Sequence, residues 1–188
     1  MSTNNIQFDF KKGYKLFRRK SSEPGKLFPL FVFPNEIIET LRWLEAKPGP
    51  LKENGKVKSK LGDLAYRPGW HINENVPYVN HIGKRDKNGK IAFLPDEYVW
   101  CEVYYETTIN YQEEADKNGL NRKGIVVPKK AYLKYVPEHG YYRYKTNANQ
   151  IEPWIISGNI FIVRELADKE VEYLCSKYGL QALPRLQK

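Results

Sequence analysis

The chain has 188 residues, with 31 Lys and Arg against 22 Asp and Glu, and a formal net charge of +9 at pH 7. This length suits one domain with a sizeable core, and a content of 41% hydrophobic and 14% aromatic residues excludes wholesale disorder. The positive charge favours a polyanionic partner, and we expect nucleic acid ahead of a membrane surface.

Cysteine usage and hydropathy indicate an intracellular protein. Cys101 and Cys175 lie far apart in apolar patterns without the spacing of metal ligands, so we interpret them as reduced, buried thiols. No apolar signal core follows Met1, and no apolar run approaches membrane-spanning length. We therefore expect a soluble, cytoplasmic protein that holds no metal.

The beginning of the chain combines a polar end with strand and helix patterns. Residues 1–12 are polar and then basic, and we expect them to be loosely ordered ahead of one globular domain at residues 13–185. Two short strands are predicted at residues 14–18 and 27–33, with a turn-forming cluster between them. A helix is predicted over residues 35–46, because an Asn can cap its start, apolar residues recur at helical spacing and a proline follows.

Residues 48–62 form a connection rich in Lys, Gly and Pro, in which Lys58 and Lys60 are candidate phosphate contacts. Basic runs of this kind are usually solvated faces or loops. The alternative is a mobile basic flap that covers the turn following it in the chain.

That turn belongs to the stretch Leu64–His71, which reads Leu-Ala-Tyr-Arg-Pro-Gly-Trp-His. Proline restricts φ and glycine accepts positive φ, so the Pro-Gly pair predicts a sharp turn. Such a turn gives Arg67 and His71 defined directions at the end of an apolar strand. His71 is a candidate acid, base or phosphate contact, and equally a residue that caps a backbone carbonyl. His81 is a second candidate for these functional roles.

Residues 98–106 form the clearest predicted strand, preceded by a hairpin turn at Asn88-Gly89. Alternation places Trp100, Glu102 and Tyr104 on one face of this strand. If that face is buried, the Glu102 carboxylate needs a donor such as Arg or His. A structural ion pair and an active-site acid are the two interpretations of Glu102.

Residues 141–147 alternate rings and cations along a further predicted strand. On a strand, Tyr142 and Thr146 share one side, while Arg143 and Lys145 share the other. Arg143 and Lys145 are thus positioned to bind one anion together, and Tyr rings of this stretch could stack on bases.

The end of the chain predicts strands at residues 154–156 and 159–163, and then a helix over residues 169–178 with Asp168 as its cap. The expected fold class is α+β: a mainly antiparallel, twisted sheet with one helix after the first strands and a C-terminal helix packed on it.

Five motifs occur in a characteristic order along the chain: Arg67-Pro-Gly-Trp-His71, Val99-Trp-x-Glu-Val103, Tyr111-Gln-Glu-Glu-Ala115, Gly140-Tyr-Tyr-Arg-Tyr-Lys-Thr-Asn147 and Trp154-Ile-Ile-x-Gly158. With this series, the chain resembles a domain of unknown function that recurs in bacteriophages and mobile elements of gut bacteria, often inside very large polyvalent proteins. The resemblance extends from about Tyr14 to Arg185. It implies a phage or mobile-element setting, and therefore a bacterial host cell or a virion, but it carries no catalytic residues over.

The first functional hypothesis is an accessory protein that acts on nucleic acid as a metal-independent nuclease for RNA or DNA. Such chemistry needs an acid or base, usually His, and cations on the scissile phosphate. It requires no cofactor. The expected catalytic residues are His71, Arg67, Glu102, Tyr142 and Thr146, and the expected phosphate-binding residues are Arg143, Lys145, His81, Lys58 and Lys60.

Two alternatives remain open. Tyr66-Arg67 and Gln112-x-Glu114 are faintly similar to two elements of ADP-ribosyltransferases, which use NAD, although the middle Ser-Thr-Ser element is missing. The other alternative is a non-catalytic module that binds nucleic acid or a phage or host protein. NTP hydrolysis, serine hydrolysis and zinc chemistry are not expected, because the sequence lacks their motifs.

Overall fold

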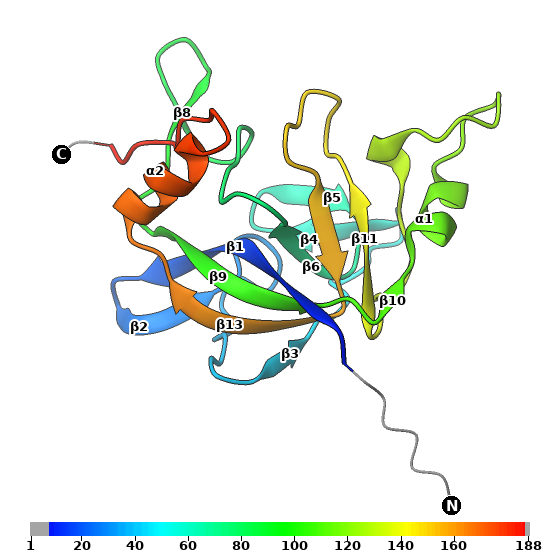
Figure 1. Ribbon diagram of the computed structural model, residues 1–188, viewed down its shortest axis with the longest axis horizontal. Coiled ribbons are helices and arrows are strands. Elements are labelled where there is room, and N and C mark those ends of the chain that lie inside the picture. The colour runs from blue at the N-terminus through cyan, green and yellow to red at the C-terminus, as the bar shows by residue number, and fades with distance from the viewer. Residues whose placement is uncertain (1–7, 187–188) are drawn as a thin grey trace, which may run out of the picture.

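The computed structural model describes residues 8–186, and most of this part of the chain is organised around one nine-stranded sheet (Figure 1). The strands of this sheet are β1 (Phe10–Lys20), β2 (Glu23–Phe28), β3 (Trp43–Glu45), β6 (Trp70–Asn73), β9 (Tyr98–Glu106), β10 (Ile109–Asn110), β11 (Gly140–Tyr144), β12 (Trp154–Ser157) and β13 (Asn159–Glu165). The smaller elements are the hairpins β4 (Lys56–Ser59) with β5 (Gly62–Ala65) and β7 (Lys84–Arg85) with β8 (Ile91–Phe93), and the helices α1 (Gln112–Asn118), η1 (Pro128–Lys130) and α2 (Asp168–Ser176).

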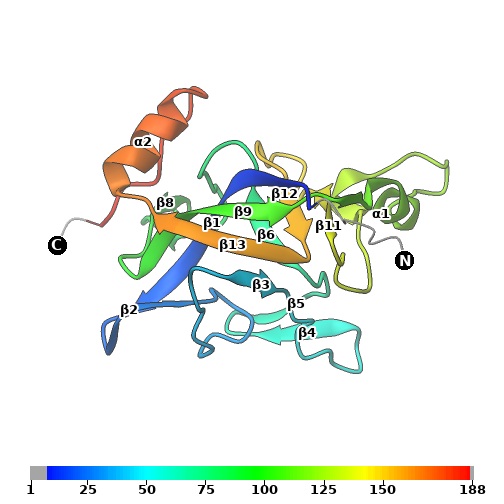
Figure 2. The same ribbon diagram turned by 60° about the horizontal axis from the view of Figure 1, so that its bottom comes forward.

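The sheet is mainly antiparallel. Its strand order is β10-β11-β12-β6-β1-β9-β13-β3, with β2 paired to β1 beside this path. The pair β10–β11 is parallel, and every other described pair in this sheet is antiparallel. In Figure 2, α2 stands above the long strands, whereas the hairpin of β4 and β5 lies on the other side, beyond β3. The sheet therefore has different partners on its two faces.

Two clusters of buried side chains make the core, and the alternation of β9 separates them. Trp100 joins Tyr142, Trp154 and Cys175 of α2 in one cluster. The β9 residues that point the other way form a second cluster with residues of β1, β6, β12 and β13. Its β9 members are Val99, Cys101, Val103 and Tyr105, and its members from the other strands include Phe17, Ile72, Ile155 and Ile160. Side chains alternate between faces along a strand, so one strand can serve two cores.

The prediction of a mainly antiparallel sheet is confirmed, and several of its elements have the expected places. The strand expected at residues 98–106 is β9 with the same bounds, and the turn at Asn88-Gly89 joins β7 to β8. The predicted C-terminal helix is α2, which starts at Asp168 and contributes Val171 and Cys175 to the core. Gly179, with a φ of 66°, follows its end.

The helix predicted over residues 35–46 is wrong, and without it the fold is not clearly of the expected α+β class. Ile38 and Leu44 do enter the core, but from an isolated bridge and from β3. Leu44 is opposite Ile160 of β13, so strand pairing overrides the local helical spacing. Leu41 has a φ of 63°, which an α-helix does not allow. The fold is mainly β.

Two further predictions differ in their bounds. The strand expected at residues 27–33 overlaps β2 only at Leu27 and Phe28. Residues 1–12 were expected outside the folded domain, but residues 10–12 begin β1 and pair with β9, while residues 1–7 lie outside the described part of the chain. Among the described residues, no helix is long and apolar enough to cross a membrane.

Candidate active site

The turn predicted at Pro68-Gly69 is present and leads directly into β6. Gly69 has a φ of 139°, and a Cβ placed there would lie 2.3 Å from Cγ2 of Ile156. Only glycine accommodates both this backbone conformation and this close packing. The turn therefore positions His71 on β6, opposite Ile156 of β12.

His71 lies among aromatic rings. Its ring centroid is 5.8 Å from that of Tyr144 and 5.9 Å from that of Trp154, in edge contacts. Nδ1 lies 3.2 Å from the carbonyl oxygen of Gly69, and a carbonyl only accepts, so Nδ1 carries the proton. Burial, followed by the charge of Lys15, lowers the pKa of His71 to about 3. Its neutral ring caps a backbone carbonyl, which is the structural interpretation of this residue.

Other predicted site residues gather around the same rings. The guanidinium of Arg67 lies 4.5 Å from the centroid of Tyr144 and donates to the carbonyl of Lys129 at 3.0 Å. Trp154 Nε1 donates to the hydroxyl of Thr146 at 3.0 Å, and the ring of His81 stands 5.8 Å from that of Trp154. The fold thus brings four predicted residues together, but around buried aromatic rings: Arg67, His71, His81 and Thr146.

The remaining predicted residues lie elsewhere. The hydroxyl of the fully buried Tyr142 accepts from Leu133 N at 3.4 Å, and burial raises the pKa of this phenol. Arg143 donates to both carboxylate oxygens of Glu74, at 3.0 and 2.6 Å, so it is not shared with Lys145 on one anion.

Glu102, Lys58 and Lys60 have structural surroundings as well. Glu102 lies 3.7 Å from Arg164, which is the structural ion pair considered from the sequence. Lys58 and Lys60 are exposed on the hairpin of β4 and β5. The backbone N–H groups of both residues bond outside this hairpin, to the carbonyls of Pro50 and Phe31. This segment forms a paired hairpin and not an irregular loop.

A different group of residues, which the sequence patterns do not single out, forms the better candidate. Glu106 is the last residue of β9, and its side chain continues the alternation of Glu102 and Tyr104. It is only 3% exposed. A buried carboxylate needs donors, and Glu106 accepts from three side chains: His139 Nδ1 at 3.0 Å, Asn159 Nδ2 at 2.7 Å and Thr108 Oγ1 at 3.4 Å.

The backbone holds His139 in place through close approaches that require glycine. A Cβ on Gly140 would lie 2.1 Å from the carbonyl oxygen of Ile109, and a Cβ on Gly158 would lie 2.3 Å from that of Pro137. The turn that carries His139 is therefore closely packed between β10 and the turn that joins β12 to β13. His139 itself has a φ of 54°, an uncommon conformation for a residue other than glycine that often occurs at functional sites.

The pair of Glu106 and His139 combines a buried carboxylate with an accessible ring. The His139 side chain is 55% exposed, whereas the carboxylate beside it is almost inaccessible. Because a carboxylate only accepts, Nδ1 of His139 carries a proton, and Nε2 of the neutral ring keeps its lone pair. A histidine oriented in this way can take a proton from a substrate and return it.

His139 lines a pocket of about 680 Å³. Tyr111 and Tyr135 stand against each other on its wall, and their hydroxyls donate to the carbonyl of Glu138 and to Glu114. The bond to Glu114 raises the pKa of Tyr135 to about 12. Among the described residues, neither a carboxylate that pairs with Lys134 nor a partner of the Tyr66 hydroxyl is present. The lining residues are Glu45, Ala46, Pro48, Tyr66, Tyr111, Lys134, Tyr135, Val136, Glu138, His139, Gly158 and Asn159.

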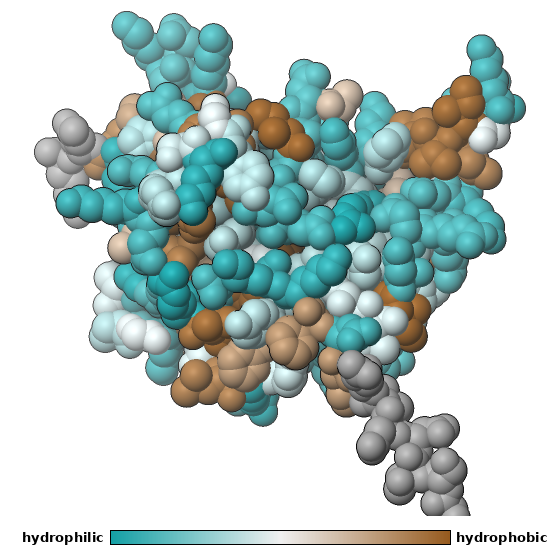
Figure 3. Space-filling model, in the orientation of Figure 1, coloured by the Kyte–Doolittle hydropathy of each residue, from teal (hydrophilic) through white to brown (hydrophobic). Residues whose placement is uncertain are grey.

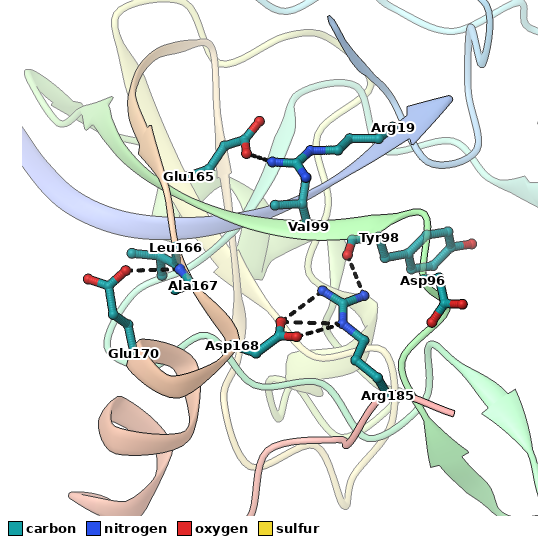
Figure 4. A pocket seen from close by; sticks show the side chains of 10 residues that line it. All are labelled: Arg19, Asp96, Tyr98, Val99, Glu165, Leu166, Ala167, Asp168, Glu170 and Arg185. Atoms are coloured by element: carbon teal, nitrogen blue, oxygen red, sulfur yellow. Dashed lines mark hydrogen bonds and ion pairs between the residues drawn. The ribbon is translucent and has the colours of Figure 1, made fainter. Parts of the chain in front are cut away.

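In a second pocket of about 430 Å³, both arginines are already paired (Figure 4). Arg185 bonds to Asp168 and to the carbonyls of Pro95 and Tyr98, and Arg19 is in contact with Glu165. These contacts join the C-terminal segment to the start of α2. We interpret this pocket as a structural junction.

Comparisons with known proteins give no independent evidence on this site. No family model, no curated protein and no solved structure matches the chain. The resemblance to a phage domain therefore stays a prediction.

Proposed function

We propose that the protein is a phage or mobile-element accessory protein that cleaves phosphodiester bonds of nucleic acid, with His139 as its acid/base group. The observation that supports this function is the buried Glu106 carboxylate, which orients an exposed histidine at the wall of a pocket. This proposal moves the expected chemistry from His71 to His139, because His71 is enclosed by rings and its protonated form is disfavoured.

The residues of the pocket suit cleavage of RNA. Nε2 of His139 takes the proton of the ribose 2′-hydroxyl, and the 2′-oxygen attacks phosphorus. The bond from phosphorus to the 5′-oxygen breaks, which leaves a 2′,3′-cyclic phosphate and a 5′-hydroxyl. Lys134 offers a positive charge for the phosphate in the transition state. Tyr66 is the pocket phenol that can supply the proton to the leaving oxygen.

The charge of the chain supports the same class of substrate. A net charge of +9 attracts polyanions and raises their local concentration. Soluble, cytoplasmic localisation in a bacterial host and a nucleic-acid partner remain parts of the proposal.

The ADP-ribosyltransferase-like alternative receives less support. Gln112 exchanges hydrogen bonds with the backbone of Arg143, and Glu114 accepts from Tyr135. Both side chains therefore have structural partners. The non-catalytic binding module is the alternative that an experiment must separate from the nuclease.

The test is incubation of labelled RNA and DNA of the same sequence, in EDTA, with the wild type and two variants. Asn tolerates left-handed φ, so His139→Asn preserves the backbone and removes the imidazole. We expect RNA cleavage by the wild type and by His71→Asn, and none by His139→Asn. Equal melting temperatures of the wild type and His139→Asn would show that the fold is intact.

Two results would contradict the proposal. Retarded but uncleaved RNA with the wild type would favour the binding module. Activity that survives in His139→Asn and disappears in a folded His71→Asn would return the chemistry to His71.

A further inference from the structure

Four aromatic side chains lie together on the sheet face that carries Glu106. They come from β1, β3, β9 and β13, and we call them the aromatic patch: Phe10, Trp43, Tyr104 and Phe161. Phe10 lies 5.0 Å from Tyr104 and 6.1 Å from Trp43, and Trp43 lies 6.0 Å from Phe161, between ring centroids. Phe161 is the cross-strand partner of both Tyr104 and Trp43. The patch therefore spans four strands.

The aromatic patch is accessible to solvent. Phe10 is 52% exposed and Trp43 is 44% exposed. Figure 3, which views this face, shows apolar residues gathered along its lower margin over β13 and β3. Clustered exposed apolar side chains mark binding surfaces, whereas single ones need no explanation.

The patch is continuous with the pocket of His139. Residues two apart on a strand share a face, so Tyr104 is followed by Glu106, and Phe161 is preceded by Asn159. Phe10 is the cross-strand partner of Glu106. The ring of Phe8 lies 6.1 Å from that of His139. One exposed surface therefore leads from the patch to the acid/base group.

Positive charges accompany both ends of this surface. Lys12 follows Phe10 on the same face of β1 and is the cross-strand partner of Tyr104. Among the described residues, neither Lys12 nor Lys134 forms an ion pair. Of the carboxylates beside this surface, Glu102 is paired with Arg164, whereas Glu45, two residues after Trp43 on β3, lines the pocket and forms no ion pair among the described residues. Rings flanked by unpaired cations suit a chain of bases and phosphates better than an apolar protein surface.

We propose that the aromatic patch binds the bases of single-stranded nucleic acid and directs its backbone toward His139. The inference rests on the proposed function, because it names the substrate class of that site. Bases of a single strand can stack on exposed rings while Lys12 and Lys134 contact the phosphates. Bases of a duplex are stacked on each other and do not offer their faces.

The test measures binding by fluorescence anisotropy, in the His139→Asn background so that the probe survives. The probes are a labelled single-stranded RNA and its duplex. Trp43→Leu and Phe10→Leu keep apolar bulk and remove the aromatic faces, so they should preserve the fold. Tyr173→Leu is the matched control, since Tyr173 is 61% exposed on α2, outside the patch.

We expect the double variant Phe10→Leu/Trp43→Leu to bind the single strand at least tenfold more weakly, with Tyr173→Leu unchanged and the duplex bound more weakly than the single strand. Equal binding by the double variant and the control would overturn the inference. A dimer of the wild type that dissociates in the double variant would also overturn it, because the patch would then join two copies of the chain.

The outcomes separate this inference from the proposed function. Patch-dependent binding without cleavage by the wild type would refute the nuclease and leave the binding site. Cleavage that does not depend on the patch would refute the binding site alone.

Discussion

Nδ1 of His139 lies 3.0 Å from a carboxylate oxygen of Glu106, although the two residues are 33 positions apart in the chain. One partner is buried at the end of β9, and the other stands exposed in the turn before β11. The buried member therefore cannot serve as a substrate contact. Under the proposed function, its role is to orient the imidazole and to stabilise the positive charge that forms when the ring takes a proton.

Replacing the carboxylate should weaken catalysis more than it weakens the fold. His139 and Asn159 both donate to Glu106 in the wild type. In Glu106→Gln, the amide NH₂ group cannot accept, so one of these two hydrogen bonds is lost. We expect the RNA cleavage rate to fall by about 10²-fold, the order of contribution of a positioned acid/base group. Initial rates measure this effect, and the exposed Glu172→Gln serves as control. A cleavage rate equal to that of the wild type would remove Glu106 from the site.

Lys134 should act on the transition state. Its Lys134→Gln variant keeps the length of the side chain and loses the charge, so we expect a lower kcat by roughly 10-fold to 100-fold. The exposed Lys87→Gln, in the turn between β7 and β8, loses the same charge from the chain and should leave kcat unchanged. Steady-state kinetics on labelled RNA compare the two variants. An equal effect of both would mean that only the net charge matters.

His71 should make the protein less stable in mild acid. Its folded pKa is about 3, against 6.5 for an ordinary histidine, so the unfolded chain binds the proton more readily. The free energy of unfolding should therefore fall as the pH decreases from about 6.5 toward 3, by at most about 1.4 kcal/mol per pH unit from this group. Urea unfolding of the wild type and His71→Gln at several pH values checks this. A difference between the two proteins that does not change with pH would contradict it.

Gly140 should tolerate no side chain. A Cβ there would overlap the carbonyl of Ile109, so Gly140→Ala must displace the turn that holds His139. We expect a loss of about 3 kcal/mol or more in the free energy of unfolding. Gly124→Ala meets open space and bears only the cost of its positive φ, about 1 kcal/mol. Denaturant unfolding of both variants measures the contrast, and similar losses would show that the close approach at β10 is unimportant.

The sequence predicts the sheet better than it predicts the site. The alternation of residues 98–106 identifies β9, and Asn88-Gly89 identifies a hairpin, because these signals are local. The segment around Leu44 misleads because its apolar spacing fits a helix, while its pairing partner Ile160 is remote in sequence. Local propensity yields to tertiary pairing there.

The candidate site depends on contacts between remote residues. Extending the alternation of β9 by one step reaches Glu106, so this residue had a signal in the sequence. His139 and Asn159 had none, because nothing local indicates that they meet the same carboxylate. The same limitation applies to Arg143, whose partner Glu74 comes from the end of another strand.

The parallel pairing of β10 with β11 has a consequence for how this protein can diversify. The chain leaves the sheet after Asn110 and returns at Gly140 beside the same strand, so both ends of the excursion are joined in register. This excursion carries six residues of the pocket wall: Tyr111, Lys134, Tyr135, Val136, Glu138 and His139. The Glu106 carboxylate and most of its partners lie outside it. The part of the pocket wall that precedes His139 can therefore be exchanged as a cassette, by insertion, deletion or grafting, while Glu106 on β9 and His139, which adjoins Gly140 of β11, keep their places at the sheet.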